Sequence, residues 1–355
     1  MFRNFKTVSR VLYGRGSFDQ LEGILQEKRK GNGSYIVFIL DDVFKDHPFR
    51  DRIPALETDR VIFVSVDEEP TTAYVDDLTL RVQRFSGILP AGVVGIGGGS
   101  TMDLAKAVSL MLTNPGSSAD YQGWDLIRNP AIYHVGVPTL SGTGAEVSRT
   151  TVLIGPQRKL GINSDHTVFD QIVLDPDLIA SPPADQRFYT GMDCYIHCVE
   201  SLTGTYLNAF SKAYGEKAMT LCREVFLTPT PDADEKMMMA SYFGGMSIVY
   251  SQVGVCHALS YGLSFVLGIH HGIGNCIVFN QLEEFYPEGV REFRRMMDFN
   301  GISLPENRVF GIEVQKLEKM IDVSLTLDPL WENALGKAWK SVITRDRIKE
   351  LYLRM

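Results

Sequence analysis

Residues 92–111 read GVVGIGGGSTMDLAKAVSLM and hold the pattern that decides the fold. Their first part, Gly92–Ile96, is a short apolar run typical of a buried strand. Three consecutive glycines, Gly97–Gly99, follow it, and a helical pattern begins near Thr101. In that pattern the apolar residues recur at helical spacing, at Leu104, Ala107, Val108 and Met111. The stretch therefore predicts a strand that turns through glycines directly into a helix.

The same alternation extends over the first half of the chain. Further β-rich apolar runs are Tyr35–Leu40, Val61–Val66, Ile132–Val137 and Ile172–Leu174. Between two of these runs, helical spacing recurs at Val75, Leu78, Val82 and Phe85. Continuous apolar strands that alternate with helices are typical of a sheet covered on both faces. We therefore predict an α/β domain with a parallel sheet.

The pattern changes near Ser181, which two prolines follow. Beyond this point no strand pattern is convincing, and long helical patterns take over. They span Asp185–Thr203, Ala209–Phe226, Asp234–Tyr250 and Val314–Val323. We predict an α/β domain over residues 1–180 and an all-helical domain over residues 181–355. A cleft between two domains is a common place for a ligand, and we expect metal and cofactor there.

Composition narrows the class of protein. The chain has 355 residues with 35 Lys and Arg against 43 Asp and Glu, a net charge of −8. Without a basic block, nucleic acid and anionic membranes are not expected partners. The most apolar stretch, 259–279, contains two adjacent histidines and an asparagine, which argues against a membrane span. Five irregularly spaced cysteines and no export signal predict reduced thiols in the cytoplasm.

The glycine turn at 97–99 suits a phosphate group. Glycines let backbone amides approach the ligand, and the start of the following helix carries a partial positive charge. Ser100 and Asp103 are placed to set this loop or to touch the ligand. The turn differs from the usual dinucleotide fingerprint and follows the third strand. A tight strand–helix turn without a ligand is the alternative.

Two other strand ends carry polar residues. The loop 138–146 reads PTLSGTGAE, and its small hydroxyl residues Thr139 and Ser141 suit a ribose, a phosphate or a nicotinamide amide. Asp41 ends the first predicted strand, where a carboxylate binds a ribose 2′-hydroxyl and repels a 2′-phosphate, which favours NAD. An ordinary loop and a helix cap are the respective alternatives.

A set of histidines predicts a metal site. Asp193 and His197 are four residues apart on a predicted helix, so they share one face. His257 and His271 follow on later segments. One carboxylate and three imidazoles suit Fe²⁺ or Zn²⁺ better than Ca²⁺ or Mg²⁺. The alternative is that each histidine is a core residue. The nearby cysteines are interpreted as small buried side chains rather than as ligands.

Taken together, these motifs resemble those of the iron-containing (group III) alcohol dehydrogenases. The stretches GGGSTMDLAK, LSGTGAEVS, GMDCYIHCVES, CHALSYGL and HHGIGN occur in the family's order. The resemblance runs from Tyr13–Gly16 to Asn275, over three quarters of the chain. It implies a dinucleotide-binding α/β domain followed by a helical domain, in agreement with the pattern.

The resemblance also implies site residues. It assigns a divalent metal, with Fe²⁺ favoured and Zn²⁺ the alternative, to Asp193, His197, His257 and His271. It assigns the pyrophosphate of NAD to Gly97, Gly98, Gly99 and Ser100. The nicotinamide and ribose contacts are expected near Asp41, Thr139, Ser141, Ser148 and Lys159.

Two departures from the family pattern bear on the substrate. Many members have a second histidine four residues after the third ligand, where this chain has Tyr261. The fourth ligand usually follows a proline, but here it follows His270. We expect Tyr261 and His270 to act near the reacting hydroxyl, Tyr261 on a polyol and His270 in proton transfer or in support of the metal ligand. Arg149, Arg158 and Lys159 follow the second glycine loop and would suit a carboxylate.

The expected activity is oxidation of a primary hydroxyl to an aldehyde by a metal-dependent oxidoreductase. The expected substrate is the terminal CH₂OH of a sugar acid such as 3-deoxy-manno-octulosonate, at its 8-position, in carbohydrate biosynthesis. The alternatives are an NAD-dependent dehydrogenase of a small alcohol or diol, a dehydroquinate-synthase-like lyase, an oxidase that uses O₂ and a binding protein without catalysis. A lyase of that kind typically has glutamate as its first metal ligand. We expect a homodimer with a small-molecule substrate.

Overall fold

The computed structural model describes residues 5–31, 33–228 and 230–355. Within them the chain forms two compact units. One comprises residues 2–141 and 145–181, and the other comprises residues 142–144 and 182–355. The short segment 142–144 thus packs with the helical unit, although the sequence on both sides of it belongs to the α/β unit. No described helix combines the length and the apolar composition needed to span a membrane.

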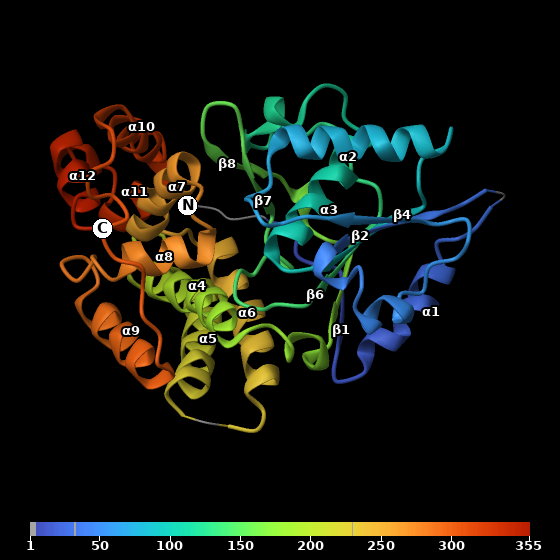
Figure 1. Cartoon of the computed structure of the whole chain (residues 1–355), viewed down its shortest axis with the longest axis horizontal. Coiled ribbons are helices and arrows are strands. Elements are labelled where there is room, and N and C mark those ends of the chain that lie inside the picture. The colour runs from blue at the N-terminus through green and yellow to red at the C-terminus, as the bar shows by residue number, and fades with distance from the viewer. Residues whose placement is uncertain (1–4, 32, 229) are drawn as a thin grey trace. The chain divides into compact units, whose positions relative to one another are not determined.

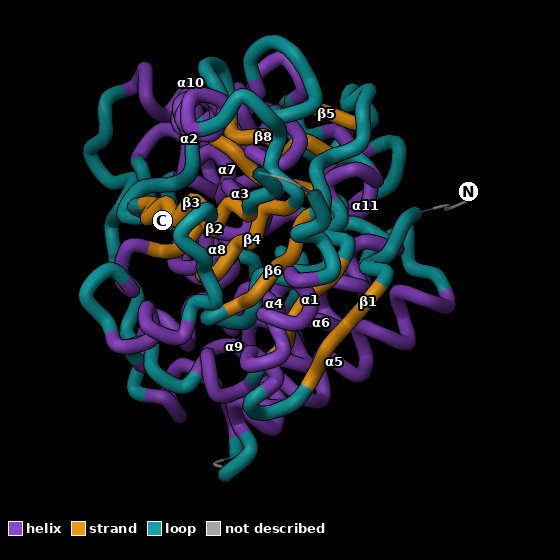
Figure 2. Tube along the Cα trace, turned by 90° about the vertical axis from the view of Figure 1, so that its right-hand side faces the viewer, coloured by secondary structure: helices purple, strands orange, loops and turns teal. Residues whose placement is uncertain are grey.

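The α/β unit is built on a six-stranded parallel sheet, which confirms the predicted fold class (Figure 1). Its strands are β1 (Arg10–Tyr13), β2 (Ile36–Asp41), β3 (Arg60–Val64), β4 (Gly92–Gly97), β6 (His134–Pro138) and β9 (Gln171–Leu174). They lie in the order β1-β9-β6-β4-β2-β3, and every pair is parallel. Figure 2 shows β2, β4 and β6 side by side.

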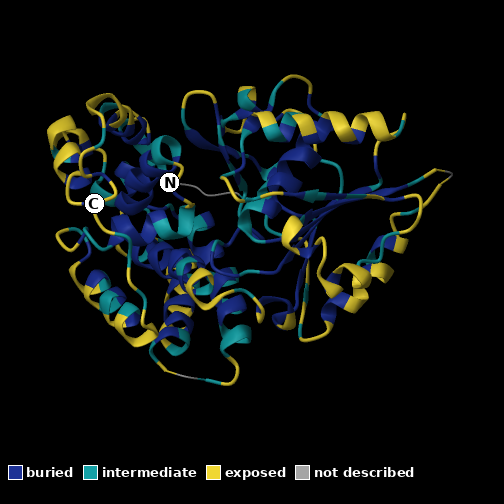
Figure 3. Ribbon diagram, in the orientation of Figure 1, coloured by how far each residue is buried: buried dark blue, intermediate teal, exposed yellow. Residues whose placement is uncertain are grey.

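Helices cover both faces of this sheet because its strands are apolar on both sides. In β2, Val37 and Ile39 belong to the core beneath α2 (Thr72–Phe85) and α3 (Gly99–Met111). The alternate β2 residues, such as Phe38, pack in the core that includes α1 (Leu21–Gln26). Burial of both side-chain sets is the main stabilising contribution to this unit. Figure 3 shows the central strands buried and the outer sides of α1 and α2 exposed.

The strand order places the glycine turn at a point where the chain changes direction in the sheet. From β2 the chain goes to β3 on one side, and then returns to β4 on the other side of β2. In such sheets ligands bind outside the carboxyl ends of the strands at this switch point. The register pairs Leu40 with Ile96 and Gly97 with Pro138. Asp41, Gly97 and Pro138 therefore end three neighbouring strands at one edge.

A second, small sheet does not appear among the predicted elements. It consists of β5 (Gly123–Trp124), β8 (Lys159–Asn163) and β7 (Thr150–Ile154), of which β7 and β8 form an antiparallel hairpin. Its strands are short, and their sequence signal is weak: β7 holds only a three-residue apolar run, Val152–Ile154, and β8 contains a lysine, a glycine and an asparagine. The sheet holds the segment that follows the second glycine loop.

The second unit is helical, as predicted, and no strand occurs among the described residues after Leu174. Its helices are α4 (Ala184–Thr203), α5 (Ala209–Leu227), α6 (Ala233–Tyr250), α7 (Val255–Leu267), α8 (His271–Phe279), α9 (Pro287–Asn300), α10 (Val314–Leu325), α11 (Asp328–Leu335) and α12 (Arg345–Tyr352). The four long helical patterns of the sequence correspond to α4, α5, α6 and α10. Short 3₁₀ turns lie at Ser17–Gln20, Asp42–Phe44, Pro48–Arg52, Ser118–Tyr121, Asp165–Thr167, Pro176–Ile179 and Trp339–Ser341.

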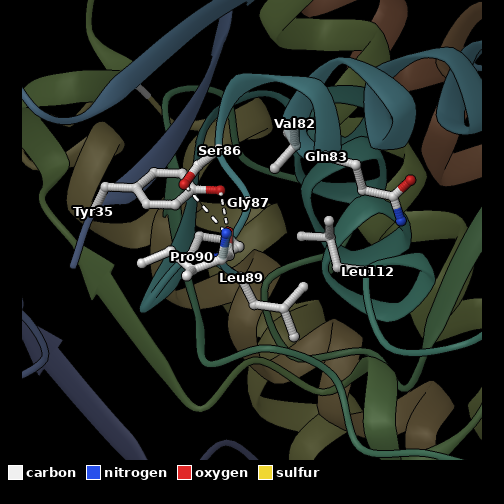
Figure 4. Close-up of a pocket in the computed structure, with 9 residues that line it drawn as sticks. Tyr35, Val82, Gln83, Ser86, Gly87, Leu89, Pro90 and Leu112 are labelled. Atoms are coloured by element: carbon white, nitrogen blue, oxygen red, sulfur yellow. Dashed lines mark hydrogen bonds between the residues drawn. The ribbon is translucent and has the colours of Figure 1, made fainter. Parts of the chain in front are cut away.

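A shallow pocket lies at the end of α2, where Tyr35, Val82 and Leu112 line it together with residues 86–90 (Figure 4). The Tyr35 hydroxyl donates a hydrogen bond to the carbonyl of Ile88, 3.1 Å away. Because β2 and β4 begin next to this pocket, it lies at the amino ends of the strands. A ligand of a parallel sheet binds at the opposite edge, so the pocket is not the dinucleotide site.

Candidate metal and dinucleotide sites

Helix α4 places a carboxylate and an imidazole together inside the helical unit. Asp193 and His197 are one turn apart, and both are almost fully buried. The His197 Nε2 atom lies 3.4 Å from Asp193 Oδ1. Nearly all residues in this part of α4 are buried. Buried polar side chains need polar partners, so Asp193 and His197 require such partners on neighbouring helices.

Two other helices supply these partners. His257 lies in the first turn of α7, and its Nε2 atom is 3.3 Å from Asp193 Oδ1. Gly268 ends α7 with φ of 66°, a left-handed conformation that favours glycine, and the chain then turns into α8. His271 opens α8, with Nε2 3.6 Å from Asp193 Oδ2. The rings of His197 and His257 stack with centroids 4.9 Å apart. The three predicted histidine ligands thus surround the carboxylate of the fourth, Asp193.

The electrostatics of this cluster favour a cation. Burial alone would raise the pKa of Asp193, but the surrounding imidazoles of His197, His271 and His257 outweigh it and hold that pKa well below its usual range. Burial lowers the pKa of His197 to about 4, so this imidazole is neutral at pH 7. At His257 burial also acts to lower the pKa, but the Glu200 and Asp193 carboxylates outweigh it and raise that pKa to about 9. The carboxylates of the cluster thus attract positive charge, and a metal would displace a proton from His257.

The residues present fit a divalent transition metal. Three imidazoles and one carboxylate are donors that Fe²⁺ and Zn²⁺ accept, and the ligand atoms of Asp193, His257 and His271 lie within 4.8 Å of one another. The Asp193 Oδ2 atom is buried and has no hydrogen-bond partner. Burying a carboxylate oxygen without a hydrogen-bond partner costs free energy unless a cation lies beside it. The donor set and this oxygen therefore both point to a metal.

Two residues of the cluster were missed by the sequence reasoning. The Asn275 amide Nδ2 lies 2.6 Å from Asp193 Oδ1, 3.1 Å from His257 Nε2 and 3.2 Å from His271 Nε2. Glu200 accepts a hydrogen bond from His257 Nδ1 at 2.6 Å. Helical spacing contained the signal, because Asn275 is four residues after His271 and Glu200 is three after His197.

The second group of predicted residues lies at the carboxyl edge of the sheet. Gly98 is the N-cap of α3 and offers no side chain to the first helical amides. Those amides and the partial positive charge of the helix start are available to a phosphate. Thr139 donates its backbone N–H to the Gly97 carbonyl at 3.0 Å, which brings the second glycine loop beside the first.

Glycines allow β4 and α3 to pack closely. A Cβ atom on Gly97 would lie 2.5 Å from the Thr101 side chain, and one on Gly95 would lie 2.6 Å from Ala105 Cβ. By contrast, a Cβ on Gly98 would meet only Leu140, at 3.7 Å. The hydroxyl of Ser141 is buried without a hydrogen-bond partner among the described residues. Gly97 thus serves packing, whereas a side chain at Gly98 would have room.

Other residues predicted to contact the cofactor have partners within the α/β unit. The Asp103 carboxylate accepts a hydrogen bond from the Val152 amide of β7 at 3.0 Å, and burial raises its pKa to about 7. Ser148 accepts a hydrogen bond from the buried Lys106 Nζ at 3.0 Å. Lys159 is itself buried and forms a 2.7 Å ion pair with Glu69. The first two contacts tie α3 to residues 148–152, and the third ties β8 to the segment before α2.

Residues 142–144 pack within the helical unit. Gly142 has φ of 149°, and a Cβ atom there would lie 1.8 Å from the Thr190 carbonyl oxygen of α4. Gly144 has φ of 66° and donates its N–H to Ser241 Oγ of α6 at 3.2 Å. Only glycine fits both the conformation and this close approach.

Comparison with protein families decides the assignment. Residues 8–176 match the model of iron-containing alcohol dehydrogenase, and residues 187–325 match the C-terminal model of the Fe-containing alcohol dehydrogenase family. The chain belongs to the iron-containing alcohol dehydrogenase family. Members of this family are oxidoreductases that act on alcohols.

Relatives of this chain include both reductases and dehydrogenases. The chain is 28% identical to the sulfoacetaldehyde reductase of Bilophila wadsworthia, over 75% of this chain and 70% of that protein. It is 26% identical to the 1-propanol dehydrogenase PduQ of Citrobacter freundii, over 84% of this chain and 77% of that protein. The crystal structure of sulfoacetaldehyde reductase from Bifidobacterium kashiwanohense in complex with NAD⁺ has a TM-score of 0.80 at 20% identity, covering 99% of this chain and 98% of that one. This last likeness concerns the fold.

Within this iron-containing alcohol dehydrogenase, the two family departures fall in different surroundings. Tyr261 lies one turn after His257 on α7, with ring centroids 6.4 Å from His257 and 6.0 Å from His271. His270 is the N-cap of α8 and its side chain is exposed. The structure therefore brings Tyr261 to the metal cluster, whereas His270 faces outward beside a predicted ligand.

Proposed function

We propose that this protein is a metal- and NAD-dependent dehydrogenase that interconverts a primary alcohol and its aldehyde. The observation that carries the proposal is the convergence of three imidazoles on the buried Asp193 carboxylate, in a chain of the iron-containing alcohol dehydrogenase family. The names of the relatives, a sulfoacetaldehyde reductase and a 1-propanol dehydrogenase, are consistent with this direction of chemistry.

In the proposed mechanism, Asp193, His197, His257 and His271 hold the divalent cation. When bound, the cation supplies Lewis acidity that makes a substrate hydroxyl easier to deprotonate. Asp193 contributes a full negative charge, since the neighbouring imidazoles lower its pKa. Burial of the cluster excludes water and strengthens each electrostatic contact. Tyr261 orients the substrate hydroxyls, and His270 links the proton path to solvent.

At the edge of the sheet, the first amides of α3 bind the pyrophosphate of NAD, next to Gly98 and Ser100. NAD supplies the hydride acceptor for alcohol oxidation. Asp41 accepts from the ribose hydroxyls and repels a 2′-phosphate, which sets the preference against NADP. Burial raises the pKa of Asp41, and the nearby Asp42 and Asp67 carboxylates raise it further. The ionised form of Asp41 is therefore disfavoured, and a hydrogen bond from a ribose hydroxyl would stabilise it.

The finer substrate proposal is a sugar acid such as 3-deoxy-manno-octulosonate, oxidised at its terminal CH₂OH. Tyr261 near the metal cluster supports it, because a phenol can donate to a polyol. Arg149 does not, because its guanidinium pairs with Asp125 at 2.6 Å and Asp165 at 3.1 Å. Lys159 is likewise paired with Glu69. Of the three basic residues expected to suit a carboxylate, Arg158 is left, and small alcohols or aldehydes remain the broader proposal.

One experiment tests the activity. The purified protein is analysed for metal and then screened with ethanol, propanediol, sulfoacetaldehyde and sugar acids, while NADH and O₂ are followed together. We expect bound iron or zinc and NADH change without O₂ consumption. O₂ consumption with peroxide release would instead identify an oxidase, and turnover without net NADH change would identify a lyase.

We further propose that the protein acts in the cytoplasm as a homodimer. Support for the compartment comes from the cysteines Cys194, Cys198, Cys222, Cys256 and Cys276, all of which are free and buried. Light scattering coupled to size-exclusion chromatography measures the oligomeric state directly, and a mass of one chain would contradict the dimer.

A further inference from the structure

A buried carboxylate lies behind one of the proposed metal ligands. Glu200 is on α4, two turns after Asp193, and its side chain is fully buried. Its Oε2 atom lies 2.6 Å from His257 Nδ1, on the side of the imidazole that faces away from Asp193. A buried carboxylate is costly unless several donors satisfy it, so the neighbouring groups decide its role.

The carboxylate is fixed by more than the histidine. Its Oε1 atom accepts a 2.6 Å hydrogen bond from the backbone N–H of Cys256, in the first turn of α7. The N-cap of α7 is Gly254, which has no side chain to provide such a bond. A Cβ atom there would lie 2.7 Å from the Tyr286 hydroxyl and 3.3 Å from Glu200 Oε1. Glu200 therefore caps α7 from another helix, where the partial positive charge of the helix start also favours it.

This arrangement determines how His257 presents its two nitrogens. With Nδ1 donating its proton to Glu200, Nε2 is the nitrogen that offers its lone pair to a metal when the ring is neutral. The Nε2 atom lies 3.3 Å from Asp193 Oδ1 and faces the other proposed ligands. A carboxylate that accepts from a ligating imidazole fixes its tautomer and ring orientation, and increases its basicity.

We propose that Glu200 is a positioning residue of the metal site, which holds His257 in the ligating tautomer and thereby sets metal affinity. The proposal rests on the proposed function of the Asp193 cluster as a metal site. A purely structural role as the cap of α7 makes a different prediction, namely a loss of stability with unchanged metal affinity.

The test compares metal affinity in matched variants. Wild-type protein as isolated is exchanged to Zn²⁺, and affinity is measured by competition with a chelator whose zinc complex absorbs visible light. Glu200→Gln keeps the size of the side chain but removes the charge. We expect roughly 10- to 100-fold weaker Zn²⁺ binding, the usual effect of losing such a partner.

Glu292→Gln is the control. Glu292 also binds a residue of α4, since it accepts a 2.8 Å hydrogen bond from the Tyr195 hydroxyl, and it pairs with Arg223 rather than with a proposed ligand. Its substitution should leave Zn²⁺ affinity within about twofold of wild type. Both variants replace a glutamate that contacts α4 or lies on it with glutamine. A loss of Zn²⁺ affinity in Glu200→Gln alone therefore indicates an effect on the metal site rather than on packing in general.

The outcomes distinguish this inference from the proposed function. If His257→Ala loses the metal but Glu200→Gln binds Zn²⁺ as tightly as wild type, the role of Glu200 is wrong and the metal site stands. If His257→Ala also keeps its Zn²⁺, the proposed metal site itself falls. If Glu200→Gln does not fold, ¹⁵N-correlated NMR of the wild-type zinc protein decides. We expect His257 to carry its proton on Nδ1, and a proton on Nε2 would overturn the proposal.

Discussion

The two candidate sites are built by different means. The metal cluster uses side chains from α4, α7 and α8, which lie far apart in sequence and meet at one buried carboxylate. The dinucleotide edge uses backbone amides and glycines at the ends of neighbouring strands. The cluster should therefore be sensitive to the chemistry of each side chain, and the edge to the addition of a Cβ atom. Substitutions of the two kinds test this difference.

The largest effect is expected in the metal cluster. His257→Ala removes an imidazole donor and leaves Glu200 buried without its histidine partner. We expect loss of most bound metal and a fall in turnover of roughly 10³-fold or more, since the reaction depends on the cation. Elemental analysis and steady-state kinetics measure both. Far-ultraviolet circular dichroism should remain like that of the wild type, and a variant with full metal content would contradict the assignment.

The glycine edge should respond differently at two adjacent positions. Gly98→Val should weaken NAD binding at least about tenfold while metal content and thermal stability stay near wild type, because a Cβ there has room within the protein. Gly97→Ala should lower stability by about 1–3 kcal/mol, because its Cβ would collide with Thr101. Titration calorimetry and thermal unfolding separate the two effects. Equal NAD affinity in wild type and Gly98→Val would place the dinucleotide elsewhere.

A smaller effect is expected for cofactor choice. Asp41→Ala removes the carboxylate at the end of β2, and with it the repulsion of a 2′-phosphate. The ratio of kcat/KM for NAD over that for NADP should fall about tenfold, equivalent to ~1.4 kcal/mol. Asp42→Ala, next in the chain, is the matched control and should change the ratio much less. An unchanged ratio in Asp41→Ala would remove Asp41 from the cofactor site.

The smallest effect concerns Asp103, which lies on the glycine-turn helix but is bonded to β7. Burial raises its pKa to about 7, so between pH 4 and 7 the folded state holds a proton that the unfolded state has released. Stability from this group is thus fully present at low pH and is lost as pH rises through about 7. Asp103→Asn should flatten that part of the stability–pH curve. NAD affinity should stay within about twofold, and a larger loss would return Asp103 to the cofactor site.

Much of the fold could be predicted because its signals are local. The apolar run and glycines of 92–99 mark β4 and the start of α3, and the long helical patterns mark α4, α5 and α6. Strand β1 was not predicted, since it lies at the sheet edge and its residues are largely exposed. The β7–β8 hairpin was also missed, because β7 holds only a three-residue apolar run, Val152–Ile154, and β8 contains a lysine, a glycine and an asparagine.

The site residues also differ in whether a local pattern or long-range packing places them. The spacing of Asp193 and His197 predicts that they share a helix face, and the structure brings His257 and His271 to them. Such a meeting of distant helices depends on packing that no local pattern encodes. The pairing of Lys159 with Glu69 is another long-range contact. Lys159 was predicted to contact the cofactor, but its ammonium group forms an ion pair within the protein. Glu200 and Asn275 were within reach of the helical-spacing argument that identified the other residues.

The most direct test of the central claim is metal reconstitution. The protein is stripped with a chelator and titrated anaerobically with Fe²⁺, while bound metal and the rate of NADH formation from a primary alcohol are followed in the same samples. The account predicts that activity rises with bound metal and levels off at one equivalent per chain, and that Asp193→Ala neither binds nor responds. Full activity of the stripped protein, or normal titration of Asp193→Ala, would contradict it.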